Sequence, residues 1–298
     1  MSGPPRHHPP TGAGPSEDLP ASPPARLAFS TLAFPGATLA AAASLGRSWG
    51  YAGIELRLVD GELIDPAQPA AARARVKRDL GGLPVAAVDS SIRLTDDDPG
   101  PALRRFLELA SDWEAPLVRV FGGALPPGAG SPAAGSPAPR AARLAAAARV
   151  LDAALPRAQR LGVAIGVETH DDFSSSAALA ELLALADPAA LASGSLGAVW
   201  DSHHPHRMGE TPGQVYANIG RHTLLAQVKD ARPQDGGWQL VLLGHGEVPV
   251  RPMLGLLADG GYPGWISVEW EKHWHPEIEE PEVALPQHLE VLTRWLCQ

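Results

Sequence analysis

From Leu27 onward, short apolar runs rich in β-branched residues alternate with longer segments rich in alanine and leucine. The short runs are typical of buried strands, and the longer segments are typical of helices. Strict alternation of the two predicts βαβ units and a parallel sheet. We expect strands at 27–32, 53–56, 85–89, 117–121, 163–168, 197–201, 223–228 and 265–269. We expect helices near 37–49, 67–80, 100–113, 140–161, 175–186, 212–220, 250–260 and 282–296.

Eight strands that alternate with eight helices predict an α/β fold of the (β/α)8 TIM-barrel type. The chain of 298 residues has a suitable length for one such barrel. We therefore expect a single barrel domain over residues 26–298. Residues 1–25 are dominated by Pro, Gly, Ser and Ala, which predicts a disordered tail.

Polar side chains follow four of the predicted strands, at the point where each strand ends. Val163 leads to Glu168, and later strands end at Asp201 and Glu269. The strand at 223–228 carries Gln227 and is followed directly by Lys229. Because the carboxyl ends of the strands converge on one face of a barrel, we expect these groups to surround one small volume.

Three clustered carboxylates suit a divalent cation such as Mg²⁺, Mn²⁺, Co²⁺ or Zn²⁺, which can polarise a substrate oxygen. The alternative is that each acid caps the helix that follows its strand. Recurrence of the pattern on four strands favours the functional interpretation over independent caps.

Composition narrows the classes of function. A formal charge of -9 and a pI near 5.6 disfavour nonspecific binding of nucleic acid. The one cysteine, Cys297, cannot form an intramolecular disulfide. The apolar stretch Leu27–Gly46 is interrupted by proline and glycine and follows a long polar segment, so a first strand and helix is favoured over a signal peptide. Without a stretch that could cross a membrane, we expect a cytoplasmic protein.

The segment Leu125–Pro139 consists largely of Pro, Gly, Ala and Ser and follows the fourth predicted strand. Its position predicts a mobile loop on the face that carries the polar strand ends. A lid over the site and an insertion without function both fit this composition, and we favour the latter.

Several motifs together resemble the sugar phosphate isomerase/epimerase family, the xylose-isomerase-like barrels. The resemblance spans about residues 27–296, and the order and spacing of its motifs are more specific than any single motif. The motifs are Arg-Val-Phe-Gly-Gly at 119–123, Val-Glu-Thr-His-Asp at 167–171, Trp-Asp-Ser-His-His at 200–204, Val-Lys-Asp at 228–230, Leu-Gly-His-Gly-Glu-Val-Pro at 243–249 and Gly-Tyr-Pro-Gly-Trp-Ile-Ser-Val-Glu at 261–269.

The resemblance implies one divalent metal ion held by Glu168, Asp201, the residue at position 227, and Glu269. The family usually has histidine where this chain has Gln227. An amide oxygen can coordinate a hard cation but is a weaker ligand than imidazole for Zn²⁺ or Co²⁺. Three alternatives follow from glutamine at this position: a site that prefers Mg²⁺ or Mn²⁺, a site that binds metal more weakly, or a site that no longer binds metal. If a metal ion is bound, Mn²⁺ or Mg²⁺ is favoured.

The implied activity is isomerisation or epimerisation of a sugar or sugar-like polyol through an enediolate, with Glu168 and Glu269 transferring the proton. The same scaffold supports a related lyase that dehydrates a keto-polyol. His204 matches a substrate-contacting histidine, and relatives are often dimers or tetramers.

Other polar residues near the strand ends are weaker candidates. His170, Lys229 and Arg119 are candidate substrate-binding residues, and Arg57 could also bind an anion, although arginines more often form surface salt bridges. Glu271 is the alternative to Glu269 if the strand ends later, and Asp230 should point away from the site. Four tryptophans could form a wall that stacks on a sugar, although core packing is favoured for Trp265; they are Trp200, Trp265, Trp270 and Trp274.

Two further classes of function are weighed against the isomerase. A nuclease of the apurinic-site endonuclease type shares the barrel but needs histidines from the third and fourth strands, which this chain lacks. The acidic charge also disfavours nucleic acid as a partner. A non-catalytic barrel whose metal site has decayed through Gln227 is the other alternative, because folds outlive functions.

Overall fold

A computed structural model of the chain describes residues 26–126 and 137–297. The predicted tail 1–25 and most of the predicted loop Leu125–Pro139 lie outside the described residues. No helix within the two described ranges is long and apolar enough to cross a membrane.

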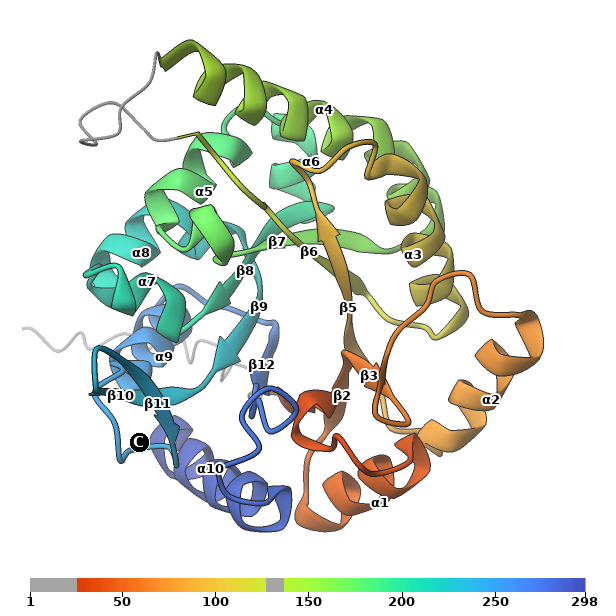
Figure 1. The fold of residues 1–298 in the computed structure, drawn as a ribbon, viewed down its shortest axis with the longest axis vertical. Helices are drawn as coiled ribbons and strands as arrows, with labels where there is room; N and C mark the ends of the chain where they lie inside the picture. Colours follow the sequence, from red (N-terminus) through yellow and green to blue (C-terminus); the bar gives the residue numbers. More distant parts are fainter. Residues whose placement is uncertain (1–25, 127–136, 298) are drawn as a thin grey trace, which may run out of the picture.

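Eight parallel strands close into a barrel, and helices surround it (Figure 1). This confirms the predicted α/β TIM barrel. Around the barrel the order is β1-β12-β9-β8-β7-β6-β5-β2. The strands are β1 (Arg26–Ser30), β2 (Gly53–Leu56), β5 (Val85–Arg93), β6 (Leu117–Phe121), β7 (Ala164–Glu168), β8 (Leu196–Asp201), β9 (Thr223–Val228) and β12 (Trp265–Val268).

All eight predicted helices are present within a few residues of their expected bounds. They are α1 (Leu39–Trp49), α2 (Ala70–Leu80), α3 (Gly100–Asp112), α4 (Pro137–Leu161), α5 (Ser176–Leu183), α8 (Pro212–Ile219), α9 (Val250–Asp259) and α10 (Pro281–Leu296). Local sequence explains several ends: the Thr211 side chain and Gln214 form a capping box at the start of α8. Gly50 ends α1 in the left-handed conformation that glycine adopts without strain.

Several short elements were not predicted. The first strand ends at Ser30, two residues early, because the Ser30 hydroxyl accepts the N–H of Leu32 and starts a 3-10 turn. Short helices α6 (Pro188–Ser193) and α7 (His203–Arg207) follow β7 and β8. Two antiparallel hairpins lie outside the barrel sheet, β3 (Leu58–Val59) with β4 (Glu62–Leu63) and β10 (Asp230–Gln234) with β11 (Gly237–Val241).

The barrel interior is divided along its axis into an apolar end and a polar end. Leu117 and Trp265, the first residues of β6 and β12, pack together with Val199 and Leu225. Gly53 makes this possible, since a Cβ there would lie 2.6 Å from the Trp265 ring. A separate, larger core fills the space between the barrel and the helices. The carboxyl ends of the strands are therefore left to carry polar side chains.

Gly197 in β8 tests how closely the strands pack. A Cβ at this position would lie 2.2 Å from the backbone oxygen of His222, and a backbone atom cannot rotate away as a side chain can. We expect Gly197→Ala to lower the free energy of unfolding by about 1–3 kcal/mol, as overpacking does. Chemical denaturation monitored by circular dichroism measures this change.

Gly255 in α9 provides the control, because a Cβ there meets no atom within 4 Å. Gly255→Ala should raise the free energy of unfolding by about 0.5–1 kcal/mol, since alanine favours helix. Equal effects of the two substitutions would contradict this account of the barrel.

His288 of α10 should make stability depend on pH. It is fully buried beside Trp270, its Nδ1–H donates to the carbonyl of Ala284, and burial lowers its pKa to about 4. In the unfolded chain its pKa is about 6.5, so between pH 6.5 and 4 the unfolded state binds a proton that the folded state does not. His288 should therefore cost about 3 kcal/mol of stability as the pH falls through this range.

Urea unfolding of the wild type and of His288→Leu at pH 7.5, 6 and 5 measures the effect. We expect the wild type to lose more stability on acidification than the variant, whatever the difference between them at pH 7.5. Parallel pH dependences would show that His288 does not titrate in this way.

Candidate active site

A cavity of about 100 Å³ opens at the carboxyl ends of the barrel strands. Charged side chains dominate its lining, and they include Arg57, Arg119, Glu168, Lys229, Glu269 and Glu271. His170, His204, Phe121 and Trp274 complete much of the wall. The polar strand ends predicted from the sequence therefore do meet at one place.

Three carboxylates form the centre of this site. Glu168, Asp201 and Glu269 each offer an oxygen, and the three oxygens lie within 4.8 Å of one another. All three residues are buried. They come from the ends of β7, β8 and β12, so the barrel brings together groups that are spread over about 100 residues of the chain.

Arg119 of β6 neutralises part of this charge. Its guanidinium lies 3.0 Å from Glu168 Oε2 and 3.3 Å from Asp89 Oδ2, and its Nη1 donates to the backbone oxygen of Ser90. Burial alone would lower the pKa of Arg119, but the carboxylates of Asp89 and Glu168 outweigh burial and raise it. Arg119 is therefore permanently charged and held in place by acids.

Lys229 is the second buried cation, and it connects the other carboxylates. Its Nζ lies 3.1 Å from Asp201 Oδ2 and also donates to Glu269 and Glu271. Burial opposes its charge, but these acids hold the pKa of Lys229 well above its ordinary value. Gln227 and Lys229 both reach the interior, and Asp230 points away, as expected.

Glu168 has a raised proton affinity. Burial raises the pKa of Glu168 well above its ordinary value, and the negative charges of Glu269 and Asp201 add to the effect, whereas Arg119 opposes it. A raised pKa lets a carboxyl group hold a proton near neutral pH and act as an acid.

Asp201 caps the following helix and also belongs to the carboxylate cluster. Its Oδ1 accepts the N–H groups of His203 and His204, which is a cap on the first turn of α7. Its Oδ2 faces Lys229. One oxygen thus fixes the loop after β8 while the other remains part of the carboxylate cluster.

Gln227 lies beneath the cluster, in contact with an acid that sequence reasoning missed. Its Nε2 donates to Glu55 Oε1 at 2.6 Å and to Glu269 Oε1 at 3.4 Å. The Gln227 amide oxygen is buried without a hydrogen-bond partner among the described residues. Burial and the neighbouring charges of Asp89 and Glu269 raise the pKa of Glu55 well above its ordinary value.

Glu55 and Asp89 are both fully buried, which makes them the principal site residues not predicted. The sequence did contain a signal: one acid lies inside the apolar strand Gly53–Leu56, and another ends the predicted strand 85–89. A charged residue is almost never fully buried unless it is paired or functional.

Two histidines stand at the edge of the cluster. His204 Nε2 lies 3.9 Å from both Glu168 Oε1 and Asp201 Oδ1, and burial lowers the pKa of His204 well below its ordinary value. It is therefore neutral and can donate or accept a hydrogen bond. His170 Nδ1 lies 2.9 Å from Asp171 Oδ1, and its ring packs against Phe121 and His204.

The predicted aromatic wall is largely absent from the cavity. Trp274 lines it and is 48% exposed, whereas Trp200 and Trp270 are buried in the core outside the barrel. Trp265 lies at the opposite end of the barrel interior, as favoured. Strand-end position alone did not reveal the direction of these side chains.

The donor set fits a hard divalent cation. Carboxylate oxygens and an amide oxygen are ligands that Mg²⁺ and Mn²⁺ prefer, and the unpartnered oxygen of Gln227 is such an amide. Lys229 contacts two of the three carboxylates, so it competes with a cation for them. Glu168, His170 and His204 also offer ligand atoms within 4.8 Å of one another.

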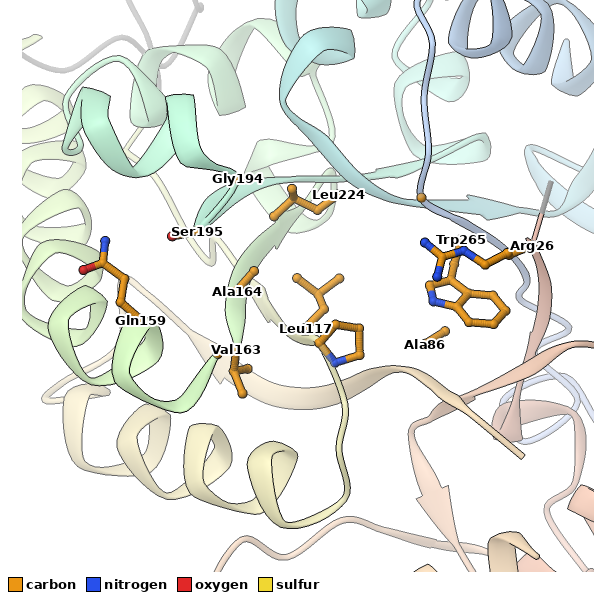
Figure 2. A pocket seen from close by; sticks show the side chains of 13 residues that line it. Arg26, Ala86, Leu117, Gln159, Val163, Ala164, Gly194, Ser195, Leu224 and Trp265 are labelled. Atoms are coloured by element: carbon orange, nitrogen blue, oxygen red, sulfur yellow. The ribbon is translucent and has the colours of Figure 1, made fainter. Parts of the chain in front are cut away.

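A larger cavity of about 470 Å³ lies at the opposite end of the barrel (Figure 2). Figure 2 shows Arg26 beside Trp265, with the guanidinium 4.9 Å from the ring centroid. Leu117, Val163 and Leu224 are among the other lining residues, and Arg26 is the one charged residue among those that line it. Without an acid, a base or a cluster of ligands, this cavity is not the candidate active site.

A family model for xylose isomerase-like TIM barrels matches residues 40–295. The chain belongs to this family. The match covers the barrel from α1 to α10 and agrees with the resemblance that the sequence motifs indicate. A comparison with curated proteins finds no match.

Solved structures share the fold at low sequence identity. The IolI protein with a bound zinc atom is 15% identical, with a TM-score of 0.71 over 91% of this chain and 98% of that one. An L-ribulose 3-epimerase is 15% identical, with a TM-score of 0.67 over 91% and 94%. The probable 3-DHS dehydratase AsbF from Bacillus anthracis is 17% identical, with a TM-score of 0.68 over 90% and 98%.

Lys229→Met tests the competition between the lysine and a cation. Removal of the ammonium leaves buried carboxylates without their partner, so without added metal we expect the variant to unfold more easily by about 3–5 kcal/mol. Mn²⁺ or Mg²⁺ should then stabilise Lys229→Met more than it stabilises the wild type. Thermal unfolding with and without each metal measures both effects.

Lys77→Met is the matched control, because Lys77 pairs with Glu114 at the surface, far from the cavity in the fold. It should leave the response to metal unchanged. If Lys229→Met gained nothing from any divalent cation, the carboxylate cluster would not be a metal site that Lys229 restricts.

Proposed function

We propose that the protein is an isomerase or epimerase that moves a proton beside the carbonyl group of a sugar or sugar-like polyol. The observation that carries this proposal is the convergence of Glu168 and Glu269, from strands β7 and β12, on one buried cavity. The two strands are three positions apart around the barrel. Two carboxylates that approach a substrate from different strands can remove a proton and return one.

Glu269 is the base in this proposal and Glu168 is the acid. Glu269 accepts a hydrogen bond from the Lys229 ammonium, which holds its side chain in place to take the proton on the carbon next to the carbonyl. Glu168, which reaches the same cavity from another strand, gives a proton to the resulting enediolate. Return to the same carbon from the other side gives epimerisation, and return to the neighbouring carbon gives isomerisation.

The cations of the site stabilise the negative charge that develops on the substrate oxygens. Lys229 and Arg119 are buried, charged and fixed by several partners, so they need little reorganisation during the reaction. A divalent cation, held by Glu168, Asp201, Glu269 and the Gln227 oxygen, would supply Lewis-acid polarisation of the carbonyl. Neutral His204 is placed to hydrogen-bond a substrate hydroxyl.

Among structures with this fold, the IolI protein carries a zinc atom and others are named as epimerases or as a dehydratase. These names support an enzyme of carbohydrate chemistry with a divalent metal. A lyase that dehydrates a keto-polyol is the second candidate, because loss of a hydroxyl group next to the carbanion begins with the same proton abstraction by Glu269.

Exchange with deuterated water tests the proposal. The wild type, incubated with a panel of ketoses and Mn²⁺ in D₂O, should incorporate deuterium at the carbon beside the carbonyl, as measured by mass spectrometry. Glu269→Gln and Glu168→Gln should each reduce the rate at least about 100-fold, the lower range for loss of a general acid or base. Glu62→Gln, an exposed acid of the β4 hairpin, should have no effect.

Metal analysis of the same proteins completes the test. We expect about one equivalent of metal in the wild type, and we expect Glu269→Gln to lose it. Incorporation that persists at the wild-type rate in both Glu168→Gln and Glu269→Gln would contradict the assigned proton transfer. Water elimination without deuterium in recovered substrate would instead identify the lyase.

A further inference from the structure

The three cations that line the cavity differ in their partners. Arg119 is shared by two carboxylates, and Lys229 is shared by three. Arg57 also lines the cavity and is only 7% exposed. Among the residues that the structure describes, however, no carboxylate lies within ion-pair distance of its guanidinium.

Arg57 has only neutral hydrogen-bond partners in the described parts of the chain. Its Nη1 donates to Ser91 Oγ at 2.9 Å and, more weakly, to the backbone oxygen of Asp89 at 3.5 Å. Buried arginines are normally paired with an acid, because an unpaired buried charge is costly. A guanidinium with five N–H groups therefore retains unused donors at the cavity.

The fold holds Arg57 at this position. The residue directly follows β2, and the hydroxyl of Thr31 accepts the backbone N–H groups of both Arg57 and Leu58. The guanidinium carbon lies 6.0 Å from the centroid of the Phe121 ring, and that of Arg119 lies 4.1 Å from it. Burial, with the nearby charge of Arg119, lowers the pKa of Arg57 to about 10, so it stays charged at neutral pH.

We propose that Arg57 binds the carboxylate of the substrate, and hence that the substrate is a sugar acid rather than a neutral sugar. The inference rests on the proposed function, which leaves the class of sugar open. A planar guanidinium matches a carboxylate with two parallel hydrogen bonds, so the contact fixes the orientation of the substrate as well as its charge. Trp274 and Phe121 also line the cavity.

A carboxylate suits this site better than a phosphate group. The cavity is small, at about 100 Å³, and six acids surround it or lie just beneath it: Glu55, Asp89, Glu168, Asp201, Glu269 and Glu271. A phosphate monoester carries up to two negative charges near pH 7, so these acids oppose it more than they oppose a single carboxylate. One unpaired guanidinium matches one negative charge.

Matched ligand pairs test the proposal. Threonate, arabinonate, xylonate and gluconate are compared with threitol, arabitol, xylitol and sorbitol, which have the same carbon skeletons without the carboxylate. Isothermal titration calorimetry with Mn²⁺-loaded protein measures each affinity. We expect at least one acid to bind about tenfold or more tightly than its polyol, and Arg57→Gln to remove that preference.

Arg93→Gln is the matched control. Arg93 lies at the end of β5, pairs with Asp171 and has a half-exposed side chain, so the substitution removes the same charge near the mouth. It should keep the preference for the acid. A preference that survives Arg57→Gln, or the absence of any preference for an acid across the panel, would overturn the proposal.

Sorbitol 6-phosphate tests whether Arg57 binds a phosphate group instead of a carboxylate. Tighter binding of this ligand than of gluconate, lost in Arg57→Gln, would identify a phosphate subsite and overturn the carboxylate assignment. Deuterium exchange separates this inference from the proposed function. If the protein exchanged deuterium into neutral ketoses but did not prefer acids, only the carboxylate subsite would be refuted. If it preferred acids through Arg57 but exchanged deuterium into no keto acid or ketose, only the proposed isomerase activity would be refuted.

Discussion

The charge balance inside the barrel mouth is the constraint on which the rest of the site depends. Glu168, Asp201 and Glu269 converge there, and charges of one sign cannot be buried together without compensation. Arg119 and Lys229 supply it through ion pairs that cross from one strand to another. The same contacts that make the cluster tolerable also hold its oxygens in fixed directions, which is what catalysis by electrostatic preorganisation requires.

The barrel provides this arrangement by dividing its interior. The apolar end, with Trp265 seated against Gly53, presents neither an acid nor a cluster of ligand groups among the described residues that line its cavity. The polar end receives side chains from strands far apart in sequence, and closure brings β7 and β12 to the same volume. Hydrogen bonds just beyond the strands then position residues of the site, as those of Asp201 with His204 and of Thr31 with Arg57 illustrate.

The sequence was sufficient for the fold and for the residues at the strand ends, because alternation of apolar runs and polar termini is a local signal. It was insufficient for contacts that cross the barrel. In the sequence, Glu55 is a single acid in a short strand. Only the closed barrel places its Oε1 2.6 Å from the Nε2 of Gln227. The partners of Lys229 likewise come from β8 and from the region after β12, and no local pattern identifies such a triple contact.

Gln227 stands where the family usually has histidine, and its contacts bear on whether the site can still bind a metal ion. Decay would leave the side chain without a specific role, yet its amide N–H groups connect Glu55 with Glu269. The amide oxygen stays buried and unpartnered beside carboxylates, a position from which it can serve a hard cation. Since Glu168, Asp201 and Glu269 converge beside it, the residues present fit a divalent cation.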